Sequence, residues 1–281
     1  VVPTPNPTHA PLAQAALAAG KHVVVDKPFT VTLAEAESLA RFAREQGRLL
    51  SVFHNRRWDS DFLTLKKVLG SGELGAIRHF ESHFDRYRPE VRARWREQAL
   101  PGSGLWYDLG SHLLDQVLQL FGLPEAIWLQ TAIQRNGAQA DDWFHALLRY
   151  GQMRVILHGS ALVPELGPRF AVHGELGSFI KFGLDAQEDL LKTGHFPPST
   201  SWGEDPVKSR LTVWNGGEAS HRELACEPGN YPAYYAAVRD AISGQGANPV
   251  PPEEAISVMR LIELGLVSSL ERRELMLSEH C

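Results

Sequence analysis

The 281-residue chain has little cysteine and no long hydrophobic run. Its two cysteines, Cys226 and Cys281, form no C-x-x-C pair, which argues against a disulfide framework and a cysteine-type zinc site. Apolar runs are short and interrupted by charge, so none reaches the roughly 20 residues that a membrane-spanning helix needs. The first residues also lack a signal-peptide pattern. We therefore expect a cytoplasmic protein that does not bind a membrane.

Positive charge is also in short supply. Lys and Arg total 28 against 33 Asp and Glu, which leaves a formal net charge of -5, and no basic run stands out. This balance argues against a nucleic-acid surface. The 43% of hydrophobic residues is enough for a sizeable core and for one large or two ordinary domains.

Residues 1–56 alternate between strand and helix patterns. Strands are expected at 1–2, 22–25 and 48–53, and helices from Thr8 to Ala19 and from Thr32 to about Gly47. Thr32 with Glu35 three residues later forms a capping box. Strands that alternate with helices over short loops predict a parallel sheet with covered faces.

The pattern changes after residue 56. Helices are expected at about 59–69 and 105–121, a strand-like stretch at 75–88, and several strands between 126 and 182. Residues 183–225 are rich in Pro, Gly and Ser and predict a long surface excursion, followed by helices at 231–242 and 252–270. Strands without intervening helices predict a mostly antiparallel sheet with one covered face. The expected fold class is α/β, with 1–56 as a parallel portion and 57–281 as an α+β domain.

Three polar segments follow the expected parallel strands, at 4–7, 26–28 and 54–56. Ligands of open parallel sheets bind beyond the carboxyl ends of the strands, where these segments converge. Polar, proline-rich loops also serve as plain turns, and that alternative stays open for each segment alone. A lysine and arginines at a sheet edge, however, call for an anionic or hydroxylated partner.

A second group of polar residues lies on the helix expected at 105–121. Asp108 and His112 are four residues apart and share one helical face, with Asp115 one turn further on. A carboxylate beside an imidazole raises the imidazole pKa and fixes its tautomer, as in a general acid/base. A surface ion pair, a buried structural histidine and a metal site remain alternatives. No H-E-x-x-H or other ligand spacing supports metal, so we expect none.

The order of short motifs resembles one known family. T-P-N-x-x-H, G-K-H-V-x-x-[DE]-K-P, N-x-R, W-R and G-x-G-x-x-x-D-x-G-x-H-x-x-D follow one another along the chain. This combination resembles the Gfo/Idh/MocA oxidoreductases. VVVDKPFTV, SVFHNRRWDSDF and ESHFDRYRPEVRARWRE look most like the branch of NADP-dependent scyllo-inositol dehydrogenases.

The resemblance implies hydride exchange between NADP or NAD and a hydroxyl or ketone of a cyclitol or sugar. It implies that Lys27 contacts both the nicotinamide ribose and the reacting hydroxyl, that His112 is the general acid/base and that Asp108 is its partner. A fixed ammonium would stabilise an alkoxide and lower the pKa of the base. The further implied cofactor contacts are Pro5, Asn6, His9, Asp26, Pro28, Arg56, Trp95 and Arg96, and the implied substrate contacts are Asp85, Arg86, Tyr87, Asp108 and His112.

The sequence departs from the family pattern at one point. The family's G-x-G-x-x-G turn belongs to a first βαβ unit, and no such motif is present. The expected complete protein therefore has roughly 60 to 70 further residues before Val1, the length of an ordinary pair of βα units, which makes 1–56 the later part of a Rossmann-type domain. A cofactor-dead polyol-binding or partner-binding module is the alternative. The resemblance also implies that the last helix packs back on the first domain and that the antiparallel sheet joins a homodimer or larger homo-oligomer.

Overall fold

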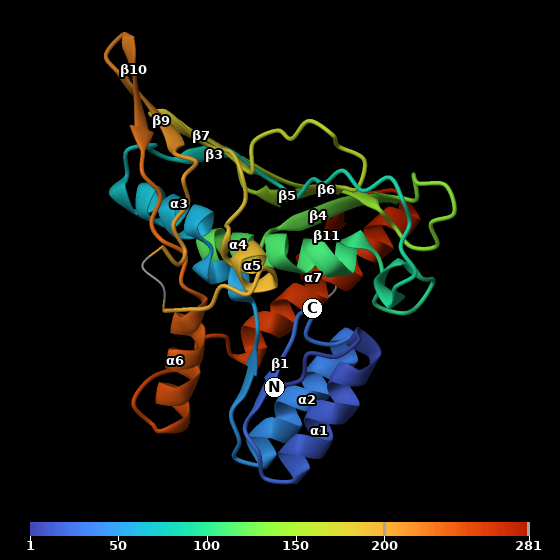
Figure 1. The fold of residues 1–281 in the computed structure, drawn as a ribbon. Helices are drawn as coiled ribbons and strands as arrows, with labels where there is room; N and C mark the ends of the chain where they lie inside the picture. Colours follow the sequence, from blue (N-terminus) through green and yellow to red (C-terminus); the bar gives the residue numbers. More distant parts are fainter. Residues whose placement is uncertain (199–200, 280–281) are drawn as a thin grey trace.

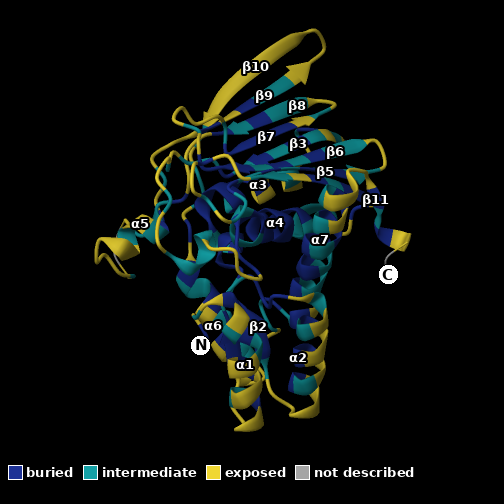
Figure 2. Ribbon diagram, turned by 90° about the vertical axis from the view of Figure 1, so that its right-hand side faces the viewer, coloured by how far each residue is buried: buried dark blue, intermediate teal, exposed yellow. Residues whose placement is uncertain are grey.

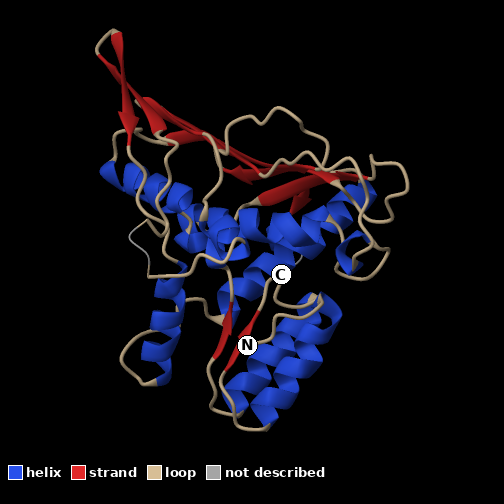
Figure 3. Ribbon diagram, in the orientation of Figure 1, coloured by secondary structure: helices blue, strands red, loops and turns tan. Residues whose placement is uncertain are grey.

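The computed structural model describes residues 1–198 and 201–279 and contains two sheets. The small parallel sheet and its helices lie at one end of the molecule, and a large mixed sheet lies at the other, with a layer of helices between them (Figure 1). Figure 3 shows the strands of both sheets in red and the helices in blue. None of the helices in the described part of the chain is long and apolar enough to cross a membrane.

The small sheet is built from residues 1–56. β1 (Val23–Val25) pairs in parallel with β2 (Leu50–Val52), and a parallel bridge joins Val2 to Val25. The 3-10 turn η1 (Asn6–Thr8), α1 (His9–Ala18) and α2 (Leu33–Glu45) connect these strands. All residues of β1 and β2 are buried, as expected for strands covered on both faces.

The start of α2 follows the predicted capping box. Thr32 Oγ1 accepts a hydrogen bond from the Glu35 backbone N–H at 3.2 Å, and Glu35 Oε2 accepts one from the Thr32 backbone N–H at 3.0 Å. The predicted cap at Thr8 is wrong, because the Thr8 hydroxyl donates to oxygens of the preceding loop instead of accepting from α1. Local hydrogen bonds from a Ser or Thr hydroxyl to loop oxygens compete with helix capping.

Within the described residues, the large sheet has nine strands in the order β10-β9-β8-β7-β3-β6-β5-β4-β11, and its only parallel pair there is β3 with β6. The prediction of a parallel α/β portion followed by a mostly antiparallel sheet is confirmed. The strands are β3 (Ile77–His83), β4 (Ala126–Ala132), β5 (Trp143–Tyr150), β6 (Met153–Ser160), β7 (Phe170–Gly174), β8 (Gly177–Lys181), β9 (Ser209–Asn215), β10 (Glu218–Leu224) and β11 (Leu275–Met276).

The surface excursion predicted for 183–225 is wrong in its main part. This stretch contains α5 (Gln187–Lys192) and the hairpin of β9 and β10, which extends the large sheet at its edge. Asn215 pairs with Glu218, so Gly216 and Gly217 form a two-residue hairpin turn with positive φ at both positions. β10 is almost entirely exposed and lacks the apolar alternation by which strands are recognised in a sequence.

A layer of helices covers one face of the large sheet. It contains α3 (Ser60–Ser71), α4 (Ser111–Phe121) and α7 (Pro252–Glu271), whereas the opposite face carries no helix among the residues described (Figures 1 and 2). The remaining helical elements are η2 (Asn55–Trp58), η3 (Trp95–Glu97), the π-helix η4 (Trp106–Gly110), α6 (Tyr231–Ile242) and η5 (Leu277–Glu279).

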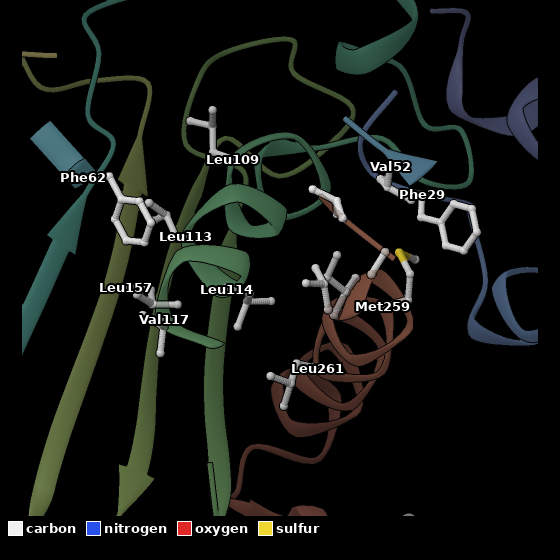
Figure 4. Packing of buried hydrophobic residues seen from close by; sticks show 14 of the residues in the cluster. Phe29, Val52, Phe62, Leu109, Leu113, Leu114, Val117, Leu157, Met259 and Leu261 are labelled. Carbon is white, nitrogen blue, oxygen red and sulfur yellow. The ribbon is translucent and has the colours of Figure 1, made fainter. Parts of the chain in front are cut away.

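α7 joins the helical layer to the first part of the chain. The Glu263 side chain accepts a hydrogen bond from the Leu33 backbone N–H at 2.6 Å, and Arg44 pairs with Glu253 at 2.7 Å, both across the contact of α2 with α7. Figure 4 shows Met259 of α7 pointing toward Phe29 and Val52. The last helix therefore packs against both sheets.

Trp106 anchors the start of the central helix. Its fully buried ring meets Phe144 edge-on at 5.1 Å, and its Nε1 donates to the Ile262 carbonyl at 3.1 Å. A Cβ at Gly110 would lie only 2.4 Å from this ring, so glycine is required there for the close approach. The ring thereby fixes the helix that carries Asp108 and His112 between the sheet and α7.

Candidate active site

A cavity of about 580 Å³ lies where the carboxyl ends of β1 and β2 face the large sheet. Val1, Pro3, Asp26 and Asn55 line it from the strand ends of the first part. Asp108, Leu109 and His112 line it from the helical layer, and α5 contributes Glu188 and Lys192. Six arginines and two lysines face this cavity against three carboxylates, and these residues are Arg56, Arg86, Arg88, Arg92, Arg94, Arg96, Lys27, Lys192, Asp26, Asp108 and Glu188.

Lys27 reaches from the end of β1 to the helical layer. Its Nζ donates to Asp108 Oδ1 at 2.8 Å and to the Asp108 backbone carbonyl, also at 2.8 Å. The Lys27 backbone N–H is held in turn by Asp26 Oδ1 at 2.8 Å. An ammonium has three donors, so this arrangement leaves one for a ligand in the cavity.

Asp108 is the partner of Lys27 and stays ionised. Burial alone would raise the pKa of the Asp108 carboxyl, but the charges of Lys27, Arg96 and Arg86 outweigh it and hold this pKa well below its usual range. Arg96 Nε lies 3.5 Å from the same oxygen that Lys27 contacts. Asp108 therefore fixes the ammonium in position.

His112 is 3% exposed and uncharged. Burial lowers the pKa of the imidazole well below its ordinary value, and the positive charges of Lys27 and Arg56 lower it further. Its Nδ1 has no hydrogen-bond partner within the described part of the chain. The residue lines the cavity, and a neutral imidazole at a cavity wall is able to accept a proton from a ligand.

The predicted carboxylate–imidazole pair is therefore wrong in one respect. Asp108 binds Lys27 instead of His112, and the pKa of His112 falls where pairing with a carboxylate would raise it. The expected lowering by a nearby ammonium is confirmed. Asp115 is also engaged elsewhere, since its carboxylate binds the buried Arg57 guanidinium through Oδ1 at 2.6 Å and Oδ2 at 2.9 Å.

A second buried histidine lies close to this group. His54 is 1% exposed, burial lowers its pKa to about 4, and neither ring nitrogen has a partner among the residues that the structure describes. Its charge would repel those of Arg57 and Lys27. The His54 imidazole therefore remains neutral just after β2.

Two expected cofactor contacts in the first loop are directed inward instead. His9 is fully buried, with Nδ1 2.9 Å from the Pro28 carbonyl and Nε2 2.8 Å from the Thr4 carbonyl. Asn6 is 3% exposed and donates to the Gly102 carbonyl at 2.7 Å. These side chains tie the first loop to the 26–28 turn and to the 102 loop, so direct ligand contact by them is not supported.

The other expected cofactor residues are divided between the cavity and its surroundings. Asp26 and Arg56 line the cavity, whereas Pro5 is exposed outside it and Pro28 is buried. Arg56 is already bound to Asp59 at 2.9 Å and to Glu188 at 3.0 Å. The Arg96 guanidinium lies 4.6 Å from the Trp95 ring centre, but of these two expected contacts only Arg96 faces the cavity.

Only one of the three expected substrate contacts from the sheet faces this cavity. Arg86 lines it, whereas Asp85 lies 3.6 Å from His83 and 3.5 Å from His158, and Tyr87 is 58% exposed. Asp85, Arg86 and Tyr87 all line an adjoining hollow of about 330 Å³, so Arg86 faces both spaces and the other two face only the hollow.

Several cavity residues were missed from the sequence. Arg88, Arg92 and Arg94 belong to the run RYRPEVRARWR, whose spaced arginines were a visible signal. Glu188 and Lys192 lie on α5, inside the stretch read as an excursion. Among the residues described, no group of three or more His, Cys, Asp or Glu is arranged to hold a metal ion.

Two family models match the chain. The Gfo/Idh/MocA model described as an oxidoreductase family with an NAD-binding Rossmann fold matches residues 1–54. The model described as the C-terminal alpha/beta domain of that oxidoreductase family matches residues 66–277. Together they account for both sheets.

Similar proteins extend over nearly the whole chain. The oxidoreductase YdgJ of Escherichia coli (strain K12) is 59% identical over 278 residues, 99% of this chain and 80% of that protein. IolW of Bacillus subtilis (strain 168), named scyllo-inositol 2-dehydrogenase (NADP(+)), is 45% identical over 100% of this chain and 78% of its own length. The solved structure of the YPO2259 oxidoreductase from Yersinia pestis has a TM-score of 0.94 at 57% identity and covers 98% of this chain and 78% of that one.

Proposed function

The chain belongs to the Gfo/Idh/MocA family of oxidoreductases, and on this premise we propose that it exchanges a hydride between NADP or NAD and the carbinol carbon of a cyclitol or sugar. The observation that carries the proposal is the meeting of Lys27, Asp108 and His112 at one cavity. Scyllo-inositol and NADP are the reference substrate and cofactor, because both stand in the name of IolW.

The first part of the chain fits a nicotinamide cofactor. Val1, Pro3, Asp26 and Asn55 at the strand ends line the same cavity as Lys27 and His112. A ring resting on these strand ends would share the cavity with a cation and with an unpartnered buried nitrogen. A bound nicotinamide supplies the hydride acceptor for oxidation, or the hydride donor for reduction of the ketone.

The side chains of this chain supply the proton transfer. As the carbinol C–H bond releases its hydride and the C=O bond forms, the hydroxyl proton needs a base within hydrogen-bond reach. Neutral His112, which lines the cavity, accepts it on its imidazole ring, and the remaining donor of Lys27 stabilises the negative charge that develops on the oxygen. Reduction of the ketone reverses each transfer.

Asp108 acts through Lys27. Its two contacts with Nζ hold the ammonium at a fixed place, and its negative charge offsets the cost of burying that ammonium. The catalytic residues are thus Lys27 and His112. Asp108 positions the lysine through Oδ1, and its other carboxylate oxygen is able to accept a hydrogen bond from a substrate hydroxyl in the cavity.

Reduction of NADP and NAD by the protein with a panel of inositols and aldoses tests this proposal. We expect turnover with at least one cyclitol or sugar and a ketone product by mass spectrometry. Absence of turnover together with absence of nicotinamide binding would refute it. Calorimetry then separates the alternatives, because polyol binding without cofactor binding favours a binding module, and activity lost on chelation favours a metal-dependent hydrolase.

We further propose that the helix-free face of the large sheet joins a second copy of the chain. Trp143, His145 and His158 lie together on that sheet, with ring centres 5.4 to 6.3 Å apart, and each is partly exposed. A one-sided sheet with exposed aromatic rings is suited to burial against another surface. Light scattering should give a dimer or larger assembly that Trp143→Glu weakens; a monomer at all concentrations contradicts the proposal.

A further inference from the structure

Most cations of the cavity have a carboxylate partner. Lys27 and Arg96 lie beside Asp108, Arg56 is bound to Asp59 and Glu188, Arg94 to Glu97, and Lys192 to Glu188 and Asp189. Arg86, Arg88 and Arg92 differ. Their guanidinium groups have no carboxylate within 4.0 Å and no side-chain hydrogen bond within residues 1–198 and 201–279. Arg92 is exposed, so water is able to solvate its guanidinium, but Arg86 and Arg88 are partly buried.

Arg86 and Arg88 are held in place by their backbone. The Arg86 N–H donates to the Ser160 carbonyl at 2.9 Å, and the Arg88 N–H donates to the Ala161 carbonyl at 2.7 Å. Residues two apart on an extended segment point to the same side, and Tyr87 between them is the exposed one. The Arg86 guanidinium also lies 4.9 Å from the Phe84 ring centre. Two cations are thus presented together, in advance of any ligand.

Within the described part of the chain, the charges of these two arginines are compensated only by carboxylates that make no direct contact with them. Burial lowers the pKa of Arg86 to about 10; the charge of Asp108 opposes this effect, and repulsion from Arg88 and Arg56 adds to it. Burial likewise lowers the pKa of Arg88, with repulsion from Arg94 and Arg92. An anion between Arg86 and Arg88 would remove this repulsion and gain charge-assisted hydrogen bonds.

We propose that Arg86 and Arg88 form an anion-binding subsite beside Lys27 and His112, and that the natural substrate is a cyclitol or sugar bearing a carboxylate or phosphate. This inference rests on the proposed dehydrogenase function and narrows its substrate class. A planar guanidinium binds both of these anions through paired N–H donors, so the chemistry is shared between them.

The position of the subsite favours an anion on the substrate over the phosphates of a cofactor. Arg86 and Arg88 extend the line of β3 on the large sheet and also line a small recess, whose wall includes Gly104, Leu105 and Ala161 and the carboxylates of Glu97, Asp108 and Asp141. No residue of 1–56 lines that recess. The strand ends proposed to hold the cofactor are those of β1 and β2, within residues 1–56.

Paired substrates test the proposal. We would compare kcat/KM for scyllo-inositol with inositol monophosphates, and for glucose with glucuronate and glucose 6-phosphate, in the wild type, Arg86→Gln, Arg88→Gln and Arg86→Lys. The matched control is Arg78→Gln, since Arg78 is an exposed arginine of β3 bound to Glu175 outside the cavity. Inorganic phosphate serves as an inhibitor against varied polyol and against varied NADP, and its binding is also measured by calorimetry.

The expected result is a preference for an acidic substrate, lost by roughly ten- to a hundredfold in Arg86→Gln and Arg88→Gln, partly restored by Arg86→Lys and unchanged in Arg78→Gln. Phosphate should compete with the polyol and not with NADP. Competition with NADP, or a raised KM for NADP alone in Arg86→Gln, would assign the arginines to the cofactor and overturn the inference. Equal use of neutral and acidic substrates by every variant overturns it too.

The two proposals fail in different ways. If no substrate is oxidised, the proposed dehydrogenase function is wrong and the substrate class falls with it. Phosphate binding that is absent in the wild type, or kept in both glutamine variants, overturns the subsite whatever the activity. Turnover of acidic substrates with unaltered kinetics in both variants leaves the dehydrogenase standing and removes the subsite alone.

Discussion

Replacing Lys27 by methionine tests the assignment of the reacting groups most directly. Methionine keeps most of the length of the side chain and removes the ammonium. The structure assigns two of the three ammonium donors to Asp108, which leaves one for the developing alkoxide. Loss of a single donor of this kind costs about 3 kcal/mol of transition-state stabilisation, on the order of a hundredfold in kcat/KM, and loss of orientation by the same residue adds to it.

The same change should alter the pH dependence. The Lys27 ammonium lowers the pKa of His112, and burial lowers it further. Without the ammonium this pKa rises, so the acidic limb of kcat/KM against pH moves to higher pH in Lys27→Met. The pKa of Asp108 should rise as well, because its lowering depends mainly on Lys27.

Steady-state kinetics across pH, with the Kd for NADPH measured by fluorescence, provide the assay. Lys21→Met is the matched control, because Lys21 is an exposed lysine on the loop before the same strand. Circular dichroism confirms that the variants fold. A Lys27→Met enzyme with kcat/KM within threefold of wild type, or an acidic limb that does not move, would refute the reasoning.

Three further predictions concern single side chains. His112→Asn should lower kcat by about two to four orders of magnitude, the size expected for loss of a general base. It should change the Kd for NADPH less than Lys27→Met does. Equal, small effects of the two substitutions would show that the roles of His112 and Lys27 are misassigned. His54 has a folded pKa of about 4, below the ordinary 6.5, so the unfolded chain gains a proton first and stability falls with pH below about 6.5. Between about pH 8 and pH 5 this amounts to about 2 kcal/mol, which His54→Leu should remove from the pH dependence of urea unfolding, and an unchanged slope would contradict it. Asp115→Asn leaves the buried Arg57 with less compensation and should cost about 3 kcal/mol in urea unfolding, while Arg57→Met with Asp115→Leu recovers part of it; a neutral Asp115→Asn would contradict this account.

The fold was predictable wherever neighbouring residues decide the structure. The capping box of Thr32 and Glu35 marks the start of α2, and the three valines of β1 are buried as their pattern indicates. β10 escaped notice because a polar edge strand is stabilised by pairing with β9 and not by its own pattern. The Gly216–Gly217 turn was the local signal that could have revealed it.

The site was predictable only in part, because a sequence motif gives the identity of the side chains but not the direction in which each one points. Asp85, Arg86 and Tyr87 were one group in the sequence, and only Arg86 also reaches the cavity of Lys27 and His112. His9 and Asn6 carry the polar groups expected of ligand contacts, yet both side chains form hydrogen bonds to backbone carbonyls of neighbouring loops. Burial and register decide such cases, and both depend on distant segments.

The sequence by itself determined that Lys27 ends a buried strand and that Asp108 and His112 lie one helical turn apart. Only the tertiary structure decided that Asp108 binds the lysine 81 residues away instead of the histidine four residues away. The physical reason is that burial keeps His112 uncharged, so a carboxylate gains far more from a full ammonium charge than from a neutral ring. That choice leaves the imidazole free to take a proton.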